Sequence, residues 1–147
     1  MTQISREDSF RKRATRSLQE GLVEDGERHP LDYILKFLCQ FHPEEGPVYI
    51  KRLAEDWHDK PVFLGCLLQC LGRVPFEIYP HYDLLQEGLK HSSLEVREGA
   101  LCALEGRCFE DKRALTILKR HNDPDRYIDG YVKRVVKDFE DLLCKKE

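Results

Sequence analysis

The stretch 91-HSSLEVREGALCALEGR-107 joins a polar turn to a helix, and it decides how the rest of the chain is interpreted. After the turn, apolar or small residues return every three or four positions, at Val96, Ala100, Ala103 and Leu104. This spacing is typical of one face of an α-helix. A single apolar stripe has to be buried against a neighbouring element. The fold therefore depends on whether this turn and helix recur along the chain.

The unit recurs at intervals of roughly thirty residues, which is the period of a stacked helical repeat. A histidine marks the turn each time, at His29, His58, His91 and His121. An apolar helical stretch follows each turn, over 31–41, 61–72, 93–106 and 127–143. Another helical stretch precedes each turn, over 5–20, 45–57, 80–90 and 110–120. Short loops favour antiparallel packing of neighbours. The sequence predicts an all-α fold, a short right-handed α-solenoid of about four helix pairs.

Composition places the chain among ordinary globular proteins. It has 147 residues, 41% hydrophobic and 35% charged, so we expect residues 1–147 to form one helical repeat domain. No apolar run resembles a signal peptide or reaches the roughly 18 residues of a membrane span. The six cysteines are scattered through apolar runs without a CxxC pair, which favours core thiols over a metal or redox site. We therefore expect a cytoplasmic protein that does not contact a membrane.

The segment 91–107 resembles the second half of a HEAT-type (armadillo-type) helical repeat. The resemblance rests on the turn, on the pair Val96-Arg97 and on the small-apolar series that follows it. In that family the valine packs inward and the arginine pairs with an acidic turn residue of a neighbouring repeat. The resemblance implies that Arg97 pairs with Asp59 or Asp123. It leaves the function open, because HEAT-like arrays serve many partners.

The sequence favours a role without catalysis, metal or cofactor. The four turn histidines allow a metal or proton site, but equivalent turns of stacked helix pairs lie about 10 Å apart. One metal ion with bonds near 2 Å does not span that distance, so capping of the turns is the better interpretation. None of GxSxG, the P-loop, HExxH or GxGxxG occurs in the sequence.

The charges are unevenly distributed. Residues 1–19 and 107–137 are net basic, whereas residues 20–106 hold sixteen acidic and eight basic residues. Such runs are often only the solvated faces of surface helices. In HEAT-like arrays, however, the second helix of each pair lines the concave face. The helix over 93–106 carries Glu95, Glu98 and Glu105 on the side opposite its core stripe. Three carboxylates on one face repel one another, and a basic partner relieves that repulsion.

The other second helices complete the predicted binding face. The helix over 61–72 is apolar nearly all round, with one polar side chain, so it is either central or partly left open for a partner. From each second helix we take the side chains that share the outer stripe. The predicted partner-binding residues are Asp32, Lys36, Gln69, Glu95, Glu98, Glu105 and Asp129. The predicted core residues are Leu67, Leu71, Val96, Ala100, Leu104, Val132 and Val135.

Three functions from different classes follow. The favoured one is a non-enzymatic protein-protein interaction module, an inhibitor or immunity-type protein that binds a basic protein through an acidic groove. The first alternative is a nucleic-acid-binding repeat protein that uses Arg11, Lys12, Arg13 and Arg16 with the basic stretch 112–137. The second alternative is a HEAT protein that resembles the bilin lyases and handles a chromophore.

Overall fold

The computed structural model describes residues 4–145, which form eight α-helices and no strand. The all-α prediction is therefore confirmed for this part of the chain. The helices are α1 (Arg6–Glu20), α2 (Pro30–Phe41), α3 (Glu45–Asp56), α4 (Pro61–Arg73), α5 (Asp83–Leu89), α6 (Leu94–Arg107), α7 (Lys112–Lys119) and α8 (Arg126–Lys145). Each lies within a few residues of a predicted helical stretch.

Local sequence signals explain where several helices begin. The Ser5 hydroxyl accepts a hydrogen bond from the backbone N–H of Asp8 and caps α1. His29 caps α2, because its Nδ1 accepts from the N–H of Leu31 while the Asp32 carboxylate accepts from the N–H of His29. Such caps satisfy N–H groups that the helix itself leaves without a partner. The predicted capping role of the turn histidine is confirmed at His29.

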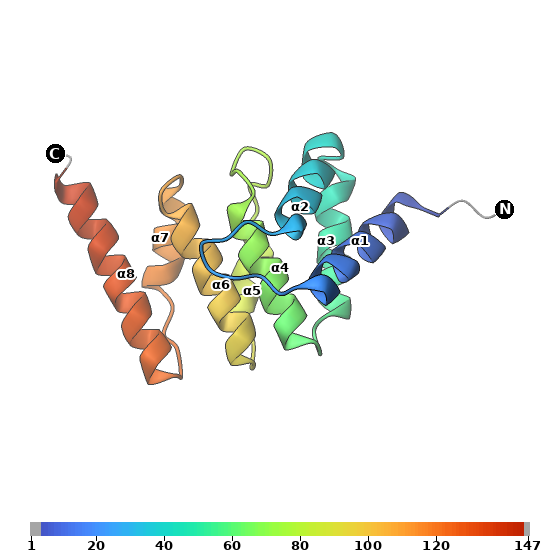
Figure 1. Cartoon of the computed structure of the whole chain (residues 1–147). Coiled ribbons are helices and arrows are strands. Elements are labelled where there is room, and N and C mark those ends of the chain that lie inside the picture. Colours follow the sequence, from blue (N-terminus) through green and yellow to red (C-terminus); the bar gives the residue numbers. More distant parts are fainter. Residues whose placement is uncertain (1–3, 146–147) are drawn as a thin grey trace.

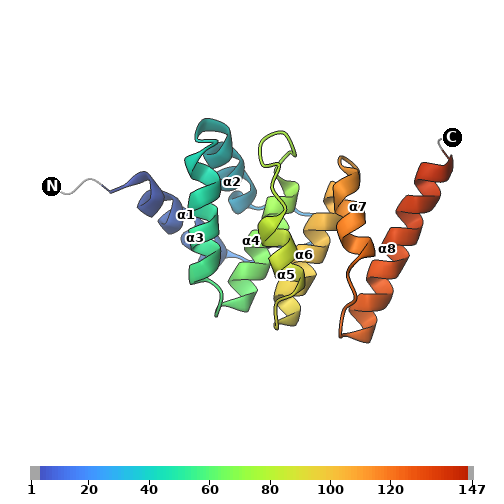
Figure 2. The same cartoon turned by 180° about the vertical axis from the view of Figure 1, so that it is seen from behind.

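The helices follow one another in chain order from one end of the molecule to the other (Figure 1). The helices α2, α4, α6 and α8 form one layer, in which each contacts the next. The helices α3, α5 and α7 lie behind them and face the viewer in Figure 2. Within the pairs, α5 packs on α6 and α7 packs on α8. The N-terminal helix α1 and the C-terminal helix α8 thus stand at opposite ends in both views.

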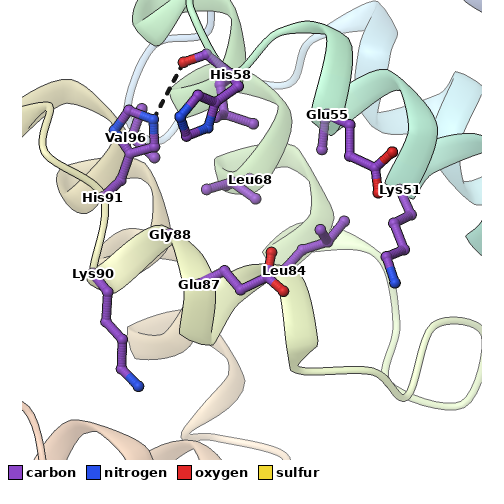
Figure 3. Close-up of a pocket in the computed structure, with 12 residues that line it drawn as sticks. Lys51, Glu55, His58, Leu68, Leu84, Glu87, Gly88, Lys90, His91 and Val96 are labelled. Carbon is purple, nitrogen blue, oxygen red and sulfur yellow. Dashed lines mark hydrogen bonds between the residues drawn. The ribbon is translucent and has the colours of Figure 1, made fainter.

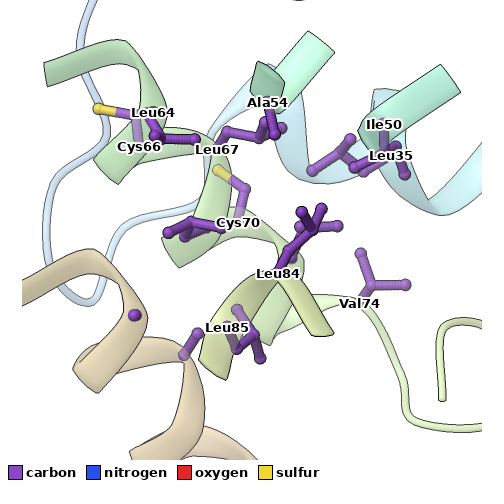
Figure 4. Close-up of a cluster of buried hydrophobic side chains, with 14 of the residues drawn as sticks. Leu35, Ile50, Ala54, Leu64, Cys66, Leu67, Cys70, Val74, Leu84 and Leu85 are labelled. Atoms are coloured by element: carbon purple, nitrogen blue, oxygen red, sulfur yellow. The ribbon is translucent and has the colours of Figure 1, made fainter. Parts of the chain in front are cut away.

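The buried core runs through both layers, and α4 lies at its centre (Figure 4). On α4, Leu67, Cys70 and Leu71 have no exposed surface. This position explains why 61–72 is apolar nearly all round. All seven predicted core residues are buried, which confirms the helical phase: Leu67, Leu71, Val96, Ala100, Leu104, Val132 and Val135.

Glycines bring α4 and α6 unusually close together. A Cβ built on Gly99 would lie 2.2 Å from the carbonyl oxygen of Gly65, and one built on Gly72 would lie 2.3 Å from the Cα of Ala103. These distances are far below normal van der Waals contact, so the two helices touch through their backbones. Only glycine permits such an approach at these positions.

An ion pair joins the start of α6 to the turn before α8. The Arg97 Nε donates to the Asp123 Oδ2 at 3.2 Å, and the Arg97 Nη1 donates to the backbone oxygens of His91 and Ser92. Asp123 is buried and also contacts the Nε2 of His121 at 2.9 Å. The HEAT resemblance implies Asp59 or Asp123 as the partner of Arg97, and in the structure the partner is Asp123. The turn before α6 and the turn before α8 are therefore fixed to each other.

Candidate functional site

The connection between α1 and α2 crosses the outer side of α4 and α6 (Figure 1). We call these residues, 21–29, the strap. Its Val23 packs against the core, and the Gln69 amide donates to the Asp25 carboxylate at 2.7 Å. Arg73 donates to two strap carbonyls, those of Glu24 at 2.9 Å and Glu27 at 2.7 Å. The strap is therefore fixed to α4 by three hydrogen bonds, and Val23 adds an apolar contact with the core.

Beside the strap lies a surface hollow of about 230 Å³, which we call the strap hollow. Three acidic residues line it, Asp25 on the strap and Glu95 and Glu98 on α6. No lysine or arginine is among its lining residues, which come from the described part of the chain. Apolar atoms complete the wall, including the exposed Leu22 and Val62. The strap hollow therefore combines negative charge with apolar surface.

Hydrogen bonds from hydroxyl groups engage two of the α6 carboxylates on this face. The Ser93 hydroxyl donates to Glu95 at 2.6 Å, and this hydrogen bond lowers the pKa of Glu95. The Tyr131 hydroxyl donates to Glu105 at 2.7 Å, and this bond is the main cause that raises the pKa of Tyr131 to about 12. Tyr131 thus stays protonated at neutral pH and continues to donate to Glu105.

The cysteine on this face is a poor nucleophile. Burial, assisted by the negative charges of Asp25, Glu105 and Glu98, raises the pKa of Cys102 to about 11. A thiol rather than a thiolate is therefore present at neutral pH, and the thiolate is the reactive form. The arrangement at this face is suited to binding a cation rather than to covalent chemistry.

Four of the seven predicted site residues share this face. Gln69, Glu95 and Glu98 line the strap hollow. Glu105 lies further along the same stripe of α6, and its charge and that of Glu98 both act on Cys102. The Gln69 amide donates to the strap residue Asp25, so this side chain helps to hold the strap in place.

The other three predicted residues lie elsewhere. Asp32 and Lys36 line a separate hollow of about 390 Å³ together with Arg73. There the Asp32 carboxylate accepts from Arg73 at 3.2 Å and from the N–H of His29. Asp129 accepts from the backbone N–H of Asp123 at 3.0 Å and from the Lys133 ammonium, which is the main cause that lowers the pKa of Asp129. Asp32 thus caps the start of α2, and Asp129 fixes the turn before α8.

The strap is the part of this site that the sequence pattern did not indicate. The segment 21-GLVEDGERH-29 has no helical or strand periodicity, so only its position between two helical stretches was evident. Two features of the sequence are nevertheless consistent with a segment that covers α4. Leu22-Val23 is an apolar pair inside an acidic segment, and the apolar helix over 61–72 needed a cover.

A second hollow of about 230 Å³ opens between α3, α4, α5 and α6, with Leu64, Leu68 and Leu84 in its wall (Figure 3). At its edge the rings of His58 and His91 lie 4.7 Å apart, edge to face. These rings are therefore closer together than the turn spacing of about 10 Å on which the prediction against a shared histidine site was based. The backbone contact between α4 and α6 brings the two turns together.

The nitrogens of His91 are already engaged. Its Nδ1 accepts from the N–H of Ser93 at 3.0 Å, so its Nε2 carries the proton that faces the carbonyl of His58 at 3.2 Å. His91 thus fixes its own turn and joins it to the preceding one. Within residues 4–145, no group of three or more His, Cys, Asp or Glu side chains is placed to hold a metal ion.

In comparisons with known proteins, no family model, no curated protein and no solved structure matches this chain. Among the described helices, none is both long and apolar enough to cross a membrane.

Proposed function

We propose that the chain is a HEAT-like helical repeat protein, a short right-handed α-solenoid, that binds a basic protein partner without catalysis. The acidic face of α6 and the strap together form the binding surface. One observation carries the proposal: Asp25, Glu95 and Glu98 line a single hollow with no lysine or arginine in its wall. An inhibitor or immunity-type role, in which the surface blocks a basic active site, fits this chemistry best.

The strap hollow matches the side chain of a lysine or arginine. Such side chains carry a cation on an aliphatic stem and bury the stem along apolar surface. The carboxylates of Glu95 and Glu98 offer partners for the cation, and Leu22 and Val62 offer apolar surface for the stem. The strap therefore supplies part of the binding surface.

Several cations of the basic segments are engaged within the protein, which favours a protein partner over nucleic acid. In the basic segments, Arg11 pairs with Asp56, and Lys133 pairs with Asp129. Arg107 is buried, and its guanidinium lies over the ring of Tyr82 at 5.4 Å. Cations already engaged within the protein are less free to replace the counterions of a phosphate backbone.

Six free cysteines fit the cytoplasmic location that the composition predicts.

Replacing Glu95, Glu98 and Glu105 together by glutamine should abolish capture of the partner from native lysate and leave the fold intact. Glu95 and Glu98 are exposed and Glu105 is half-buried, and glutamine keeps an oxygen that accepts hydrogen bonds. With the captured partner purified, surface plasmon resonance should show an association rate at least about tenfold lower, because complementary charge mainly accelerates encounter. The salt dependence of that rate should also flatten, since the Debye length is about 8 Å at physiological ionic strength.

The matched control is the triple change Glu44, Glu45 and Glu77 to glutamine. It alters the net charge equally, at exposed positions that do not line the strap hollow. This control should bind like the unchanged protein. If both triple variants bind equally well, while Arg11→Gln or Lys133→Gln abolishes binding, the acidic surface is not the working one and the nucleic-acid alternative takes its place.

A further inference from the structure

A groove of about 420 Å³ lies between α1 and α2 at the N-terminal end of the molecule. We call it the end groove. Its α2 wall is a ridge of aromatic residues one helical turn apart, Tyr33, Phe37 and Phe41. Phe37 is 50% exposed and Phe41 68% exposed, and their rings stack with centroids 6.2 Å apart. With Ile4 on the opposite side, the ridge forms an apolar surface, and apolar patches of this kind mark sites of association.

The end groove has a basic edge. Arg6 and Arg13 line it and are exposed. Neither forms an ion pair with another residue among 4–145, whereas Arg11 on the same helix pairs with Asp56. An occupant that is apolar and acidic would therefore satisfy both the aromatic ridge and the two free guanidinium groups.

The opposite end of the molecule presents a segment with this chemistry. This segment is the C-terminal end of α8, a helix of 20 residues. There the apolar stripe continues through Phe139 to Leu142 and Leu143, which are 51% and 40% exposed. Three acidic side chains are exposed on the same turns: Asp138, Asp141 and Glu140, of which Glu140 already pairs with Lys119 at 3.4 Å. We call residues 138–144 the α8 tail.

The spacing of the α8 tail suits a helix that docks in a groove. Leu142 and Leu143 stand three and four positions after Phe139, so they share its helix face. Phe139 itself packs against Phe109 and the core, and Leu142 and Leu143 are the exposed end of this face. Exposed apolar side chains on one helix face are the anchors with which an amphipathic helix fills an apolar groove. The apolar side chains of the α8 tail thus match the aromatic ridge of the end groove, and its carboxylates match the two arginines at the edge of that groove.

The α8 tail cannot reach the end groove of its own chain, because α1 and α8 stand at opposite ends of the molecule (Figures 1 and 2). We propose that the α8 tail of one copy binds the end groove of a second copy. The contact is head-to-tail, so each copy keeps one groove and one tail free for further copies. This assembly is separate from the acidic face of α6, and it stands or falls independently of the basic partner.

The test is analytical ultracentrifugation of the full chain over a wide concentration range. The unchanged protein should associate, and its mean mass should keep rising beyond that of a dimer. Phe37→Glu with Phe41→Glu blocks the groove, and Leu142→Glu with Leu143→Glu blocks the tail. Each double variant should be monomeric when alone. An equal mixture of the two should form a dimer that grows no further, because one intact groove and one intact tail remain.

Two controls keep the test decisive. Val48→Glu with Tyr127→Glu introduces the same charges at exposed positions that line neither surface, and it should associate like the unchanged protein. Circular dichroism verifies the helical fold of every variant. A further pair of double variants reverses the charges. The variant with Arg6→Glu and Arg13→Glu should associate at least about tenfold more weakly. Mixing it with the variant that carries Asp138→Lys and Asp141→Lys should restore association.

Three results would overturn the proposal. One is an unchanged protein that stays monomeric at the highest concentration. Another is association that survives either block. The third is a mixture of the two blocked variants that remains monomeric, because that result assigns the contact to like surfaces rather than to groove and tail.

Discussion

Replacing Gly99 by alanine is expected to destabilise the protein by about 3 kcal/mol or more, at the upper end of the range for overpacked cores. The added Cβ would lie 2.2 Å from the carbonyl oxygen of Gly65 and 2.9 Å from its Cα. Both obstacles are backbone atoms, so no side chain can rotate away to make room. The helices α4 and α6 would have to separate, which weakens the central interface of the fold. Urea unfolding followed by circular dichroism measures the effect.

Gly130 provides the matched control. It lies inside α8, and a Cβ built there meets nothing within 4 Å. Gly130→Ala should therefore stabilise the protein by up to about 1 kcal/mol, because alanine is the better helix former. If Gly99→Ala and Gly130→Ala change the free energy of unfolding alike, the close contact between α4 and α6 is not present in solution.

Replacing Asp123 by alanine should cost about 3–5 kcal/mol, the range observed when one partner of a buried ion pair is removed. The Asp123 side chain has no exposed surface, and its Oδ2 accepts from both Arg97 and His121. Its Oδ1 accepts from the backbone N–H of Asp125 at 3.0 Å. Alanine would leave a buried guanidinium without its carboxylate and the turn before α8 without its cap. The measurement is again the free energy of unfolding in urea.

Asp59→Ala separates this pair from a general effect of charge. Asp59 is the other acidic turn residue that the HEAT resemblance implies for Arg97, and it is exposed. Its replacement should change stability by less than about 0.5 kcal/mol. The double change Arg97→Met with Asp123→Ala should recover part of the loss, because no buried charge is then left without a partner. Equal losses for Asp59→Ala and Asp123→Ala would contradict the assignment of the pair.

The sequence predicts the helices well because each carries its own periodicity. The stripe Val96, Ala100 and Leu104 fixes the inward face of α6, and all three residues are buried. Pro30 and Pro61 mark two helix starts correctly. Spacing along one helix also places Glu95, Glu98 and Glu105 on a common face, since that relation needs no knowledge of the neighbouring helices.

Relations between helices are less predictable. The separation of His58 and His91 depends on how closely α4 and α6 approach, and that depends on Gly65 meeting Gly99 across the interface. A general helix-pair width does not contain this information. Asp32 and Asp129 occupy the predicted stripe, but Asp32 is engaged in the cap of α2 and Asp129 in the turn before α8. The strap lacks any period, so nothing in its sequence fixes its path over α4 and α6.

The path of the strap has a consequence for the order in which the molecule unfolds. In a row of helices that contact only their neighbours, a terminal pair can fray at the loss of a single interface. The strap instead links α1 and α2 to α4 and to α6, through the Asp25–Gln69 and Arg73 hydrogen bonds and the wall of the strap hollow. Fraying of the N-terminal pair would also uncover the centre of the core. The first six helices should therefore open as one cooperative unit, and α7 and α8, whose main contacts outside their own pair are with α6, should exchange their amide hydrogens first.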